Sequence, residues 1–169
     1  MLKGFKNAAE LDFSIASNVD AMERAFQQVD AEKGAVYPLI IGGERIVTDQ
    51  KITSVAPSTK EVLGYSSSCD QALADRAIRT AYEAFQSWRL TSMEERVRCV
   101  RRLVSLLEEN RFILDAWNIE ESGKNWGKAD GELCEALDFF NSYAMHAEEL
   151  DKGLELVPTE EYTKSIYIP

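Results

Sequence analysis

The sequence predicts a mostly helical α+β fold, in which a short β-hairpin region precedes three long helices and a C-terminal extended arm. From Asp70 onward, apolar residues recur every three or four positions, which is the period of an amphipathic helix. Two short apolar runs flank Gly42-Gly43, and glycine pairs of this kind favour a hairpin turn because glycine accepts positive φ. The final residues, Tyr162 to Pro169, are rich in β-forming side chains.

Residues 1–36 form a polar leader with one predicted helix. Ser17 or Asn18 can cap its start, and Gly34 marks its end. The apolar face of this helix consists of Val19, Met22, Phe26 and Val29.

Short strands follow the leader. The hairpin pairs residues 38–41 with residues 44–47. Two further strands are expected at residues 51–55 and 61–66, and the turn between them is Pro57-Ser58-Thr59-Lys60.

Three long helices are expected after Asp70. Ser92 and Glu95 form a capping box at the start of the second helix, and Asn110 either ends that helix or bends it. Gly123 stops this run, and the third helix closes at Gly153 and Pro158. The extended arm at residues 162–169 has no obvious partner nearby in the sequence, which suggests a partner elsewhere in a longer chain or in another subunit.

Composition excludes several classes of function. The 169 residues carry a net charge of −10, which argues against nucleic acid as a partner because phosphate binding needs a concentrated basic surface. The arginines at positions 96, 98, 101 and 102 fit a solvated helix flank paired with Glu94 and Glu95. No apolar run approaches the roughly 20 residues needed to span a membrane. The three cysteines form neither a disulfide framework nor a zinc pattern, so a reducing cytoplasm is the expected setting.

Six motifs in a fixed order resemble the N-terminal part of aldehyde dehydrogenases. They are Ile41-Gly42-Gly43-Glu44-Arg45 with Ser54-Val55-Ala56-Pro57-Ser58, Glu61-Val62-Leu63-Gly64, Ala81 to Trp88, Ser92 to Arg96, Glu121-Ser122-Gly123-Lys124, and Glu135-Ala136-Leu137-Asp138-Phe139. The leader, Tyr37 to Ile46, Trp126 to Asp130 and Phe139 to Ala144 are most similar to the 1-pyrroline-5-carboxylate dehydrogenase branch. Members of that branch oxidise L-glutamate γ-semialdehyde to L-glutamate with NAD in proline catabolism.

This resemblance implies an α/β parent enzyme of which the chain is an N-terminal fragment. Residues 37–153 correspond to the family's N-terminal strands and helical layer, and residues 154–169 to the start of its oligomerisation arm. The family's cysteine nucleophile, general base, oxyanion asparagine and most of its NAD site follow the position of Pro169, so none of them maps here. We therefore expect the chain alone to be inactive and to bind no NAD. The alternative is a non-catalytic oligomerisation or interaction module derived from an aldehyde dehydrogenase.

Only Glu135 is expected to touch substrate. In the related branch the matching glutamate lies near the substrate's amino group, whereas the structural alternative is an ordinary helix-surface glutamate, with or without an ion pair to Lys128 or an arginine. We predict no catalytic or metal-binding role for Cys69, Cys99 and Cys134, and we expect His146 to be exposed on a helix. Gly42-Gly43 lacks the helix and lysine of a phosphate loop. The arm from Tyr162 to Pro169 is expected to add a strand to another copy of the chain or to the C-terminal part of the enzyme.

Overall fold

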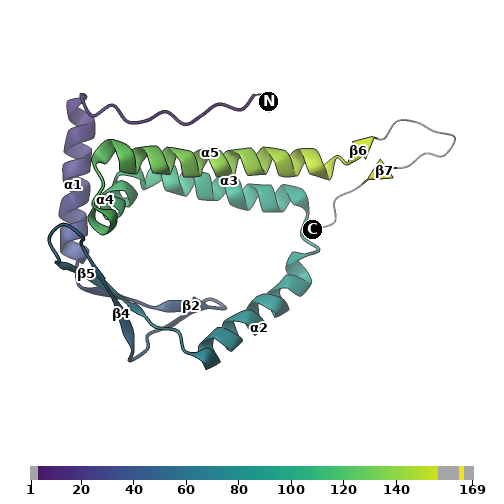
Figure 1. Ribbon diagram of the computed structural model, residues 1–169. Coiled ribbons are helices and arrows are strands. Elements are labelled where there is room, and N and C mark those ends of the chain that lie inside the picture. Colours follow the sequence, from purple (N-terminus) through teal and green to yellow (C-terminus); the bar gives the residue numbers. More distant parts are fainter. Residues whose placement is uncertain (1–3, 156–163, 166–169) are drawn as a thin grey trace.

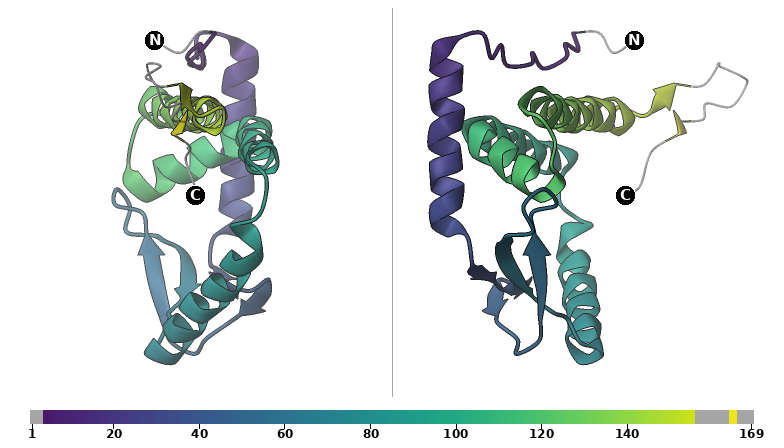
Figure 2. Two further views of the ribbon diagram at one scale, coloured as in Figure 1. Left: turned by 90° about the vertical axis from the view of Figure 1, so that its right-hand side faces the viewer. Right: turned by 60° about the vertical axis from the view of Figure 1, so that its left-hand side comes forward.

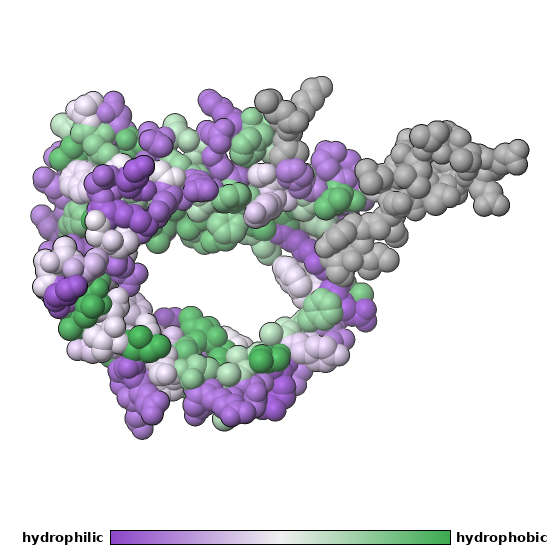
Figure 3. All heavy atoms as spheres, in the orientation of Figure 1, coloured by the Kyte–Doolittle hydropathy of each residue, from purple (hydrophilic) through white to green (hydrophobic). Residues whose placement is uncertain are grey.

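The computed structural model describes residues 4–155 and 164–165, and it arranges them around a central opening (Figures 1 and 3). A helical layer lies on one side of the opening, and the strands with helix α2 lie on the other. The elements are α1 (Ala16–Glu32), β1 (Ala35–Tyr37), β2 (Leu39–Ile41), β3 (Glu44–Ile46), β4 (Lys51–Val55), β5 (Val62–Ser67), α2 (Gln71–Trp88), α3 (Met93–Glu109), α4 (Arg111–Ser122), α5 (Trp126–Asp151), β6 (Leu154–Glu155) and β7 (Lys164–Ser165).

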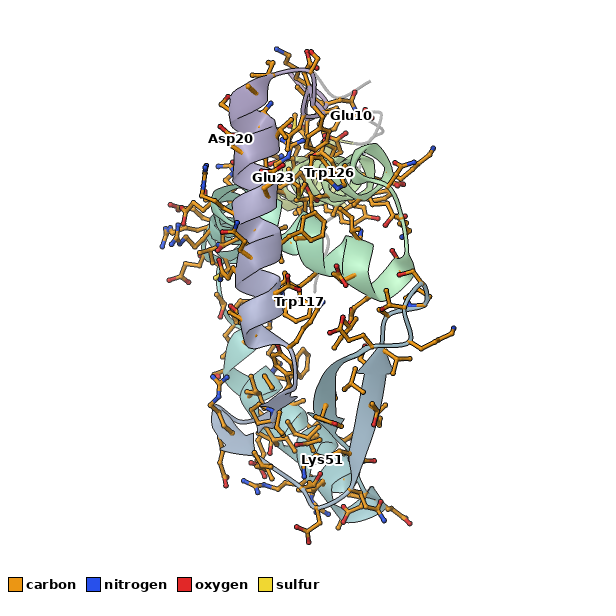
Figure 4. The ribbon with its side chains drawn as sticks, turned by 90° about the vertical axis from the view of Figure 1, so that its left-hand side faces the viewer. Glu10, Asp20, Glu23, Lys51, Trp117 and Trp126 are labelled. Atoms are coloured by element: carbon orange, nitrogen blue, oxygen red, sulfur yellow. The ribbon has the colours of Figure 1, made fainter. Side chains whose placement is uncertain are left out.

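The core of the helical layer forms where α1 crosses α4 and the start of α5. Met22, Ala25 and Val29 of α1 are buried against Ala116 of α4, because their spacing places them on one helical face. Aromatic residues surround this cluster, and Figure 4 shows Trp126 and Trp117 at two heights along α1. The Trp126 ring lies 5.3 Å from Phe13 and 5.9 Å from Phe26, within the range of favourable aromatic pairs.

Two small sheets form the opposite side. The hairpin β2–β3 pairs Ile41 with Glu44, so its turn consists of Gly42 and Gly43 alone. Their φ angles of 60° and 83° are those of a tight hairpin turn, which confirms this prediction. The other sheet has the strand order β1-β5-β4, with β1 parallel to β5 and β4 antiparallel to it.

Lys33 joins the two sides of the molecule. Its ammonium group lies 2.8 Å from Asp30 at the end of α1, 3.0 Å from Glu61 before β5 and 3.5 Å from Glu120 on α4. These carboxylates raise the pKa of Lys33 well above its usual value, with Asp30 contributing most and burial opposing the shift. One cation therefore fixes the sheet relative to α1 and α4.

Several helix boundaries confirm the predictions. The Ser92 hydroxyl accepts a hydrogen bond from the Glu95 backbone N–H at 3.2 Å, as a capping box requires. Asn110 ends α3 and α4 begins directly after it, so the second of the three predicted long helices is two helices. Gly123, at φ 72°, ends α4 in the left-handed conformation.

The predicted cap of α1 is wrong. The helix begins at Ala16, with Ile15 in the capping position and no side-chain cap. Instead of accepting a bond from the first helical turn, the Asn18 amide donates to the Asp12 carbonyl at 3.0 Å. The local turn formed by residues 12–15 therefore replaces the side-chain cap.

The expectation that the terminal strand lacks a nearby partner is also corrected. Lys164 and Ser165 pair antiparallel with Glu155 and Leu154, directly after α5. The other residues of the predicted arm, together with Pro158, lie outside the described residues. Among the described helices, none is long and apolar enough to cross a lipid bilayer.

Helix α2 stands apart from the core of the helical layer. Figure 2 shows it beside the strands and away from the helical layer. None of its 18 residues is buried. Arg76 of α2 forms an ion pair with Glu44 of the hairpin. Gly42 of the hairpin turn also lies close to Thr80 of α2, and a Cβ atom added at Gly42 would lie 3.0 Å from the Thr80 methyl group, too close for a larger residue.

Candidate functional site

Glu135 lies in a groove at the N-terminal end of α5. The groove has a volume of about 580 Å³ and is lined by Glu10, Asn125, Gly127, Lys128, Gly131, Glu132 and Glu135. Asn125 starts the helix, because its side chain accepts a hydrogen bond from the Lys128 N–H at 2.9 Å. Residues 128, 132 and 135 then follow at helical spacing on one face. The leader contributes Glu10 from the other side.

The side chains that line the groove carry a net negative charge. They include three glutamates and one lysine. Glu132 is held by Lys124 at 2.6 Å and by the Asn118 amide at 3.1 Å, and these two bonds lower its pKa, Lys124 contributing most. Such a groove favours a cationic group over an anion.

Glu135 itself is exposed and unpaired. In the described part of the chain it forms no ion pair with Lys128 or with any arginine, and its exposed position on α5 also agrees with the structural alternative of an ordinary helix-surface glutamate. Its carboxylate is therefore available to an external donor, and the predicted contact with a substrate ammonium stays a prediction.

Two of the cysteines are exposed, and one is buried. Cys69 precedes α2 and Cys99 lies on α3, both exposed, whereas Cys134 is buried. Burial raises the pKa of the Cys134 thiol, with Arg111 opposing the shift from 3.0 Å. A buried thiol with a raised pKa makes a poor nucleophile.

The single histidine is on the surface, as predicted. His146 is exposed on α5, and its Nδ1 lies 2.8 Å from the Ser142 carbonyl one turn earlier. Across the residues with described positions, no cluster of three or more histidine, cysteine, aspartate or glutamate side chains is arranged to hold a metal ion.

Unpartnered apolar surface surrounds the central opening (Figure 3). Four large side chains of α2 are exposed, with exposed fractions of 69% for Ile78, 68% for Tyr82, 44% for Phe85 and 45% for Trp88. On α5, Phe139 and Tyr143 stack with ring centroids 5.7 Å apart on an exposed face. Clustered exposed apolar side chains are typical of surfaces that a partner covers.

Comparison with known proteins identifies the family. The model of the aldehyde dehydrogenase family matches residues 46–168. The chain belongs to this family. The 1-pyrroline-5-carboxylate dehydrogenase of Geobacillus thermodenitrificans is 38% identical over 100% of this chain and 33% of its own length. An enzyme of the same name from Halalkalibacterium halodurans, 1-pyrroline-5-carboxylate dehydrogenase 1, is also 38% identical with the same coverage. The chain thus spans about a third of the length of these relatives.

Solved structures agree with this aldehyde dehydrogenase assignment. The 1-pyrroline-5-carboxylate dehydrogenase from Thermus with bound NAD is similar, with a TM-score of 0.87 and 33% identity over 92% of this chain and 30% of that chain. Proline utilization A from Bdellovibrio bacteriovorus gives a TM-score of 0.89 at 28% identity over 92% of this chain and 16% of that chain. The resemblance to the 1-pyrroline-5-carboxylate dehydrogenase branch is thereby confirmed.

The sequence of this aldehyde dehydrogenase chain did not reveal the whole groove. Glu132 could have been found, because it precedes Glu135 by three residues on the same helical face. Glu10 could not, because it reaches the groove only through the docking of the leader on α5. Asp115 was also missed, although a charged residue among Phe112, Ala116 and Ile119 on an apolar helical face is an unusual signal.

Proposed function

We propose that this chain forms the N-terminal third of an NAD-dependent 1-pyrroline-5-carboxylate dehydrogenase, which oxidises L-glutamate γ-semialdehyde to L-glutamate. The observation that carries the proposal is the match of the whole chain, at 38% identity, to one third of relatives with that name. A match of this kind favours an enzyme portion over a non-catalytic interaction module.

In this proposal Glu135 binds the α-ammonium group of the substrate. A carboxylate that accepts a hydrogen bond from an ammonium group is a strong, charge-assisted partner. The negative balance of the groove and the absence of an ion pair at Glu135 within the described residues support this role. Lys128 on the same face provides a cation for the substrate's α-carboxylate.

The described residues do not fit NAD. A dinucleotide site needs backbone N–H groups at a glycine-rich turn that opens a helix. Gly42-Gly43 leads into strand β3 instead, and the groove at Glu135 carries charge of the wrong sign for a diphosphate. NAD is therefore proposed to bind through residues outside this chain, and no chemical step is assigned to the residues described here.

The exposed apolar faces are proposed to pack against the remaining part of the enzyme. Helix α2 has an amphipathic sequence but no buried residue, so its apolar face needs a partner. Strand addition through Tyr162 to Pro169, to another copy or to the C-terminal part, remains a proposal; only Lys164 and Ser165 of this arm are described. A cytoplasmic location is part of the same proposal, supported by three free cysteines of which two are exposed.

A chimeric enzyme tests this function. This chain replaces the matching third of the Geobacillus thermodenitrificans relative, and NADH formation from L-glutamate γ-semialdehyde is followed. We expect activity, and we expect Glu135→Gln to raise KM about tenfold or more because a charged hydrogen bond is worth about 1.5–3 kcal/mol. Glu108→Gln, at an exposed glutamate on α3 away from the groove, is the matched control.

Two outcomes would contradict the proposal. An inactive chimera that is folded and binds NAD would reject the assignment of this chain to the enzyme. An active chimera in which Glu135→Gln and Glu108→Gln have the same KM would retain the enzyme but remove Glu135 from its substrate site. We also expect the 169-residue chain alone to form no NADH.

A further inference from the structure

Two aspartates from adjacent helices are buried beside a single arginine. Asp115 on α4 has an exposed fraction of 1%, and Asp130 on α5 has one of 0%. The Arg111 side chain, one turn before Asp115, is 16% exposed. Two ionised carboxylates with one guanidinium group would leave one buried negative charge without compensation, which is costly in a protein interior.

Asp130 and Arg111 hold the leader on the helical layer. One Asp130 oxygen accepts from the Leu11 backbone N–H at 2.7 Å, and the other accepts from Arg111 Nε at 2.6 Å. Arg111 Nη2 also donates to the Ala9 carbonyl at 2.9 Å. The carboxylate of Asp130 and the guanidinium of Arg111 thus bind both a donor and an acceptor of the leader backbone.

Asp115 has no donor. Neither of its carboxylate oxygens accepts a hydrogen bond from any described residue, although both are buried. A protonated carboxyl group resolves this, because it becomes a donor itself. Asp130 is the neighbouring carboxylate whose charge raises the pKa of Asp115, and each of its oxygens accepts only one other hydrogen bond, so it can accept that proton.

We propose that Asp115 and Asp130 share one proton, and that this proton keeps residues 9–11 of the leader docked on α5. The pair then carries a single negative charge, which matches the single charge of Arg111. When Asp115 ionises, the second negative charge competes for Arg111 and weakens the Arg111–Asp130 arrangement that binds the leader.

The charges around Asp115 agree with this arrangement. Burial and the charge of Asp130 together raise the pKa of Asp115 to about 7, with burial contributing most and Arg111 opposing the shift. Asp130 and Arg111 are the charged groups that face Asp115 from α5 and from α4 itself, and α5 also presents the Cys134 thiol.

Among the described residues, the other neighbouring helices present no charged group to Asp115. Helix α1 presents the apolar side chains Met22, Ala25 and Val29 to α4. Helix α3 meets α4 at Asn110, whose neutral amide donates to the Leu106 carbonyl. The leader contributes Glu10, which lines the Glu135 groove and whose charge helps to raise the pKa of Cys134.

Loss of the proton from Asp115 therefore changes the candidate site, because it weakens the docking of the leader. Glu10 lines the groove only while residues 9–11 stay docked, so ionisation of Asp115 removes one carboxylate from the groove. This link to Glu135 rests on the proposed function, whereas the shared proton and the docking of the leader do not.

Amide hydrogen exchange on the 169-residue chain tests the proposal. At pH 6 Asp115 is about nine-tenths protonated and at pH 8 about one-tenth, given its pKa near 7. After correction for intrinsic exchange, we expect the protection of the Leu11 amide to fall about tenfold between these pH values. In Asp115→Asn, whose amide donates to Asp130 at any pH, we expect constant protection.

A second measurement does not depend on that variant folding. Carbon NMR of the wild-type chain follows the Asp115 carboxyl carbon directly, and we expect its midpoint between pH 6 and 8. Asp138→Ala is the matched control: Asp138 accepts from the Ala8 N–H at 2.7 Å, so loss of this acceptor should lower protection at Ala8 without changing the pH profile at Leu11. A carboxyl midpoint near pH 4, or Leu11 protection that is independent of pH in the wild type, would overturn the proposal.

Discussion

Replacement of Arg111 by alanine tests the buried ion pair most directly. The wild-type side chain donates to Asp130 at 2.6 Å, to the Ala9 carbonyl at 2.9 Å and to Cys134 at 3.0 Å. After the substitution, the buried Asp130 carboxylate keeps the Leu11 N–H as its donor. Removing one partner of a buried pair leaves an uncompensated charge, so we expect the free energy of unfolding to fall by about 3–5 kcal/mol.

Urea unfolding followed by circular dichroism measures this loss. The control is Arg98→Ala, which breaks an ion pair with Glu94 whose side chains are 66% and 86% exposed, so it should cost less than about 1 kcal/mol. A double variant, Arg111→Ala with Asp130→Asn, should recover part of the loss because it removes the buried charge. If Arg111→Ala and Arg98→Ala destabilise equally, the buried pair does not hold the leader as described.

Three further predictions concern stability. Asp115 has a folded-state pKa of about 7 against an ordinary value of 3.8, so the folded state binds more protons than the unfolded state between these values. The stability that the Asp115 proton contributes is therefore complete below pH 3.8 and is lost as the pH rises through 7. Between pH 3 and pH 8, the free energy of unfolding of the wild type should fall by about 4 kcal/mol relative to that of Asp115→Asn, as measured by unfolding in urea. Leu137→Ala should lower the free energy of unfolding by about 2–5 kcal/mol, measured the same way, because this side chain is 1% exposed and its removal leaves a cavity. Ser92→Ala should cost about 1 kcal/mol through the lost cap, whereas Ser92→Asp should retain stability in thermal unfolding.

The features that the sequence predicts well are those set by neighbouring residues. Gly42-Gly43 specifies its hairpin because both residues must adopt positive φ, and no distant contact is needed. Ser92 and Glu95 specify the start of α3 for the same reason. In each case a few adjacent positions determine the backbone conformation.

Long-range pairing could not be predicted in this way. Strand β1, at residues 35–37, has only three residues and pairs in parallel with β5, with Ala35 opposite Gly64. Its position depends on the end of α1 and on the contacts of Lys33 with Glu61 and Glu120. Nothing local in the three residues encodes that partner.

The candidate site likewise has one part that the sequence predicts and one part that it does not. The position of Glu135 on an exposed helical face follows from its spacing within α5. The contribution of Glu10 depends on hydrogen bonds from the leader to residues more than 100 positions away, such as Arg111 to Ala9. A side-chain network that spans most of the chain leaves no periodic signal in the sequence.

The isolation of α2 gives the molecule a built-in optical reporter. The chain has three tryptophans, and two of them, Trp117 and Trp126, pack against the core around α1. The third, Trp88, lies on the apolar face of α2 at 45% exposure, with the Arg96 guanidinium 5.4 Å from its ring. Its fluorescence should shift to shorter wavelength when a partner covers α2, while emission from the other two stays constant, so assembly and folding can be followed separately in one unlabelled sample.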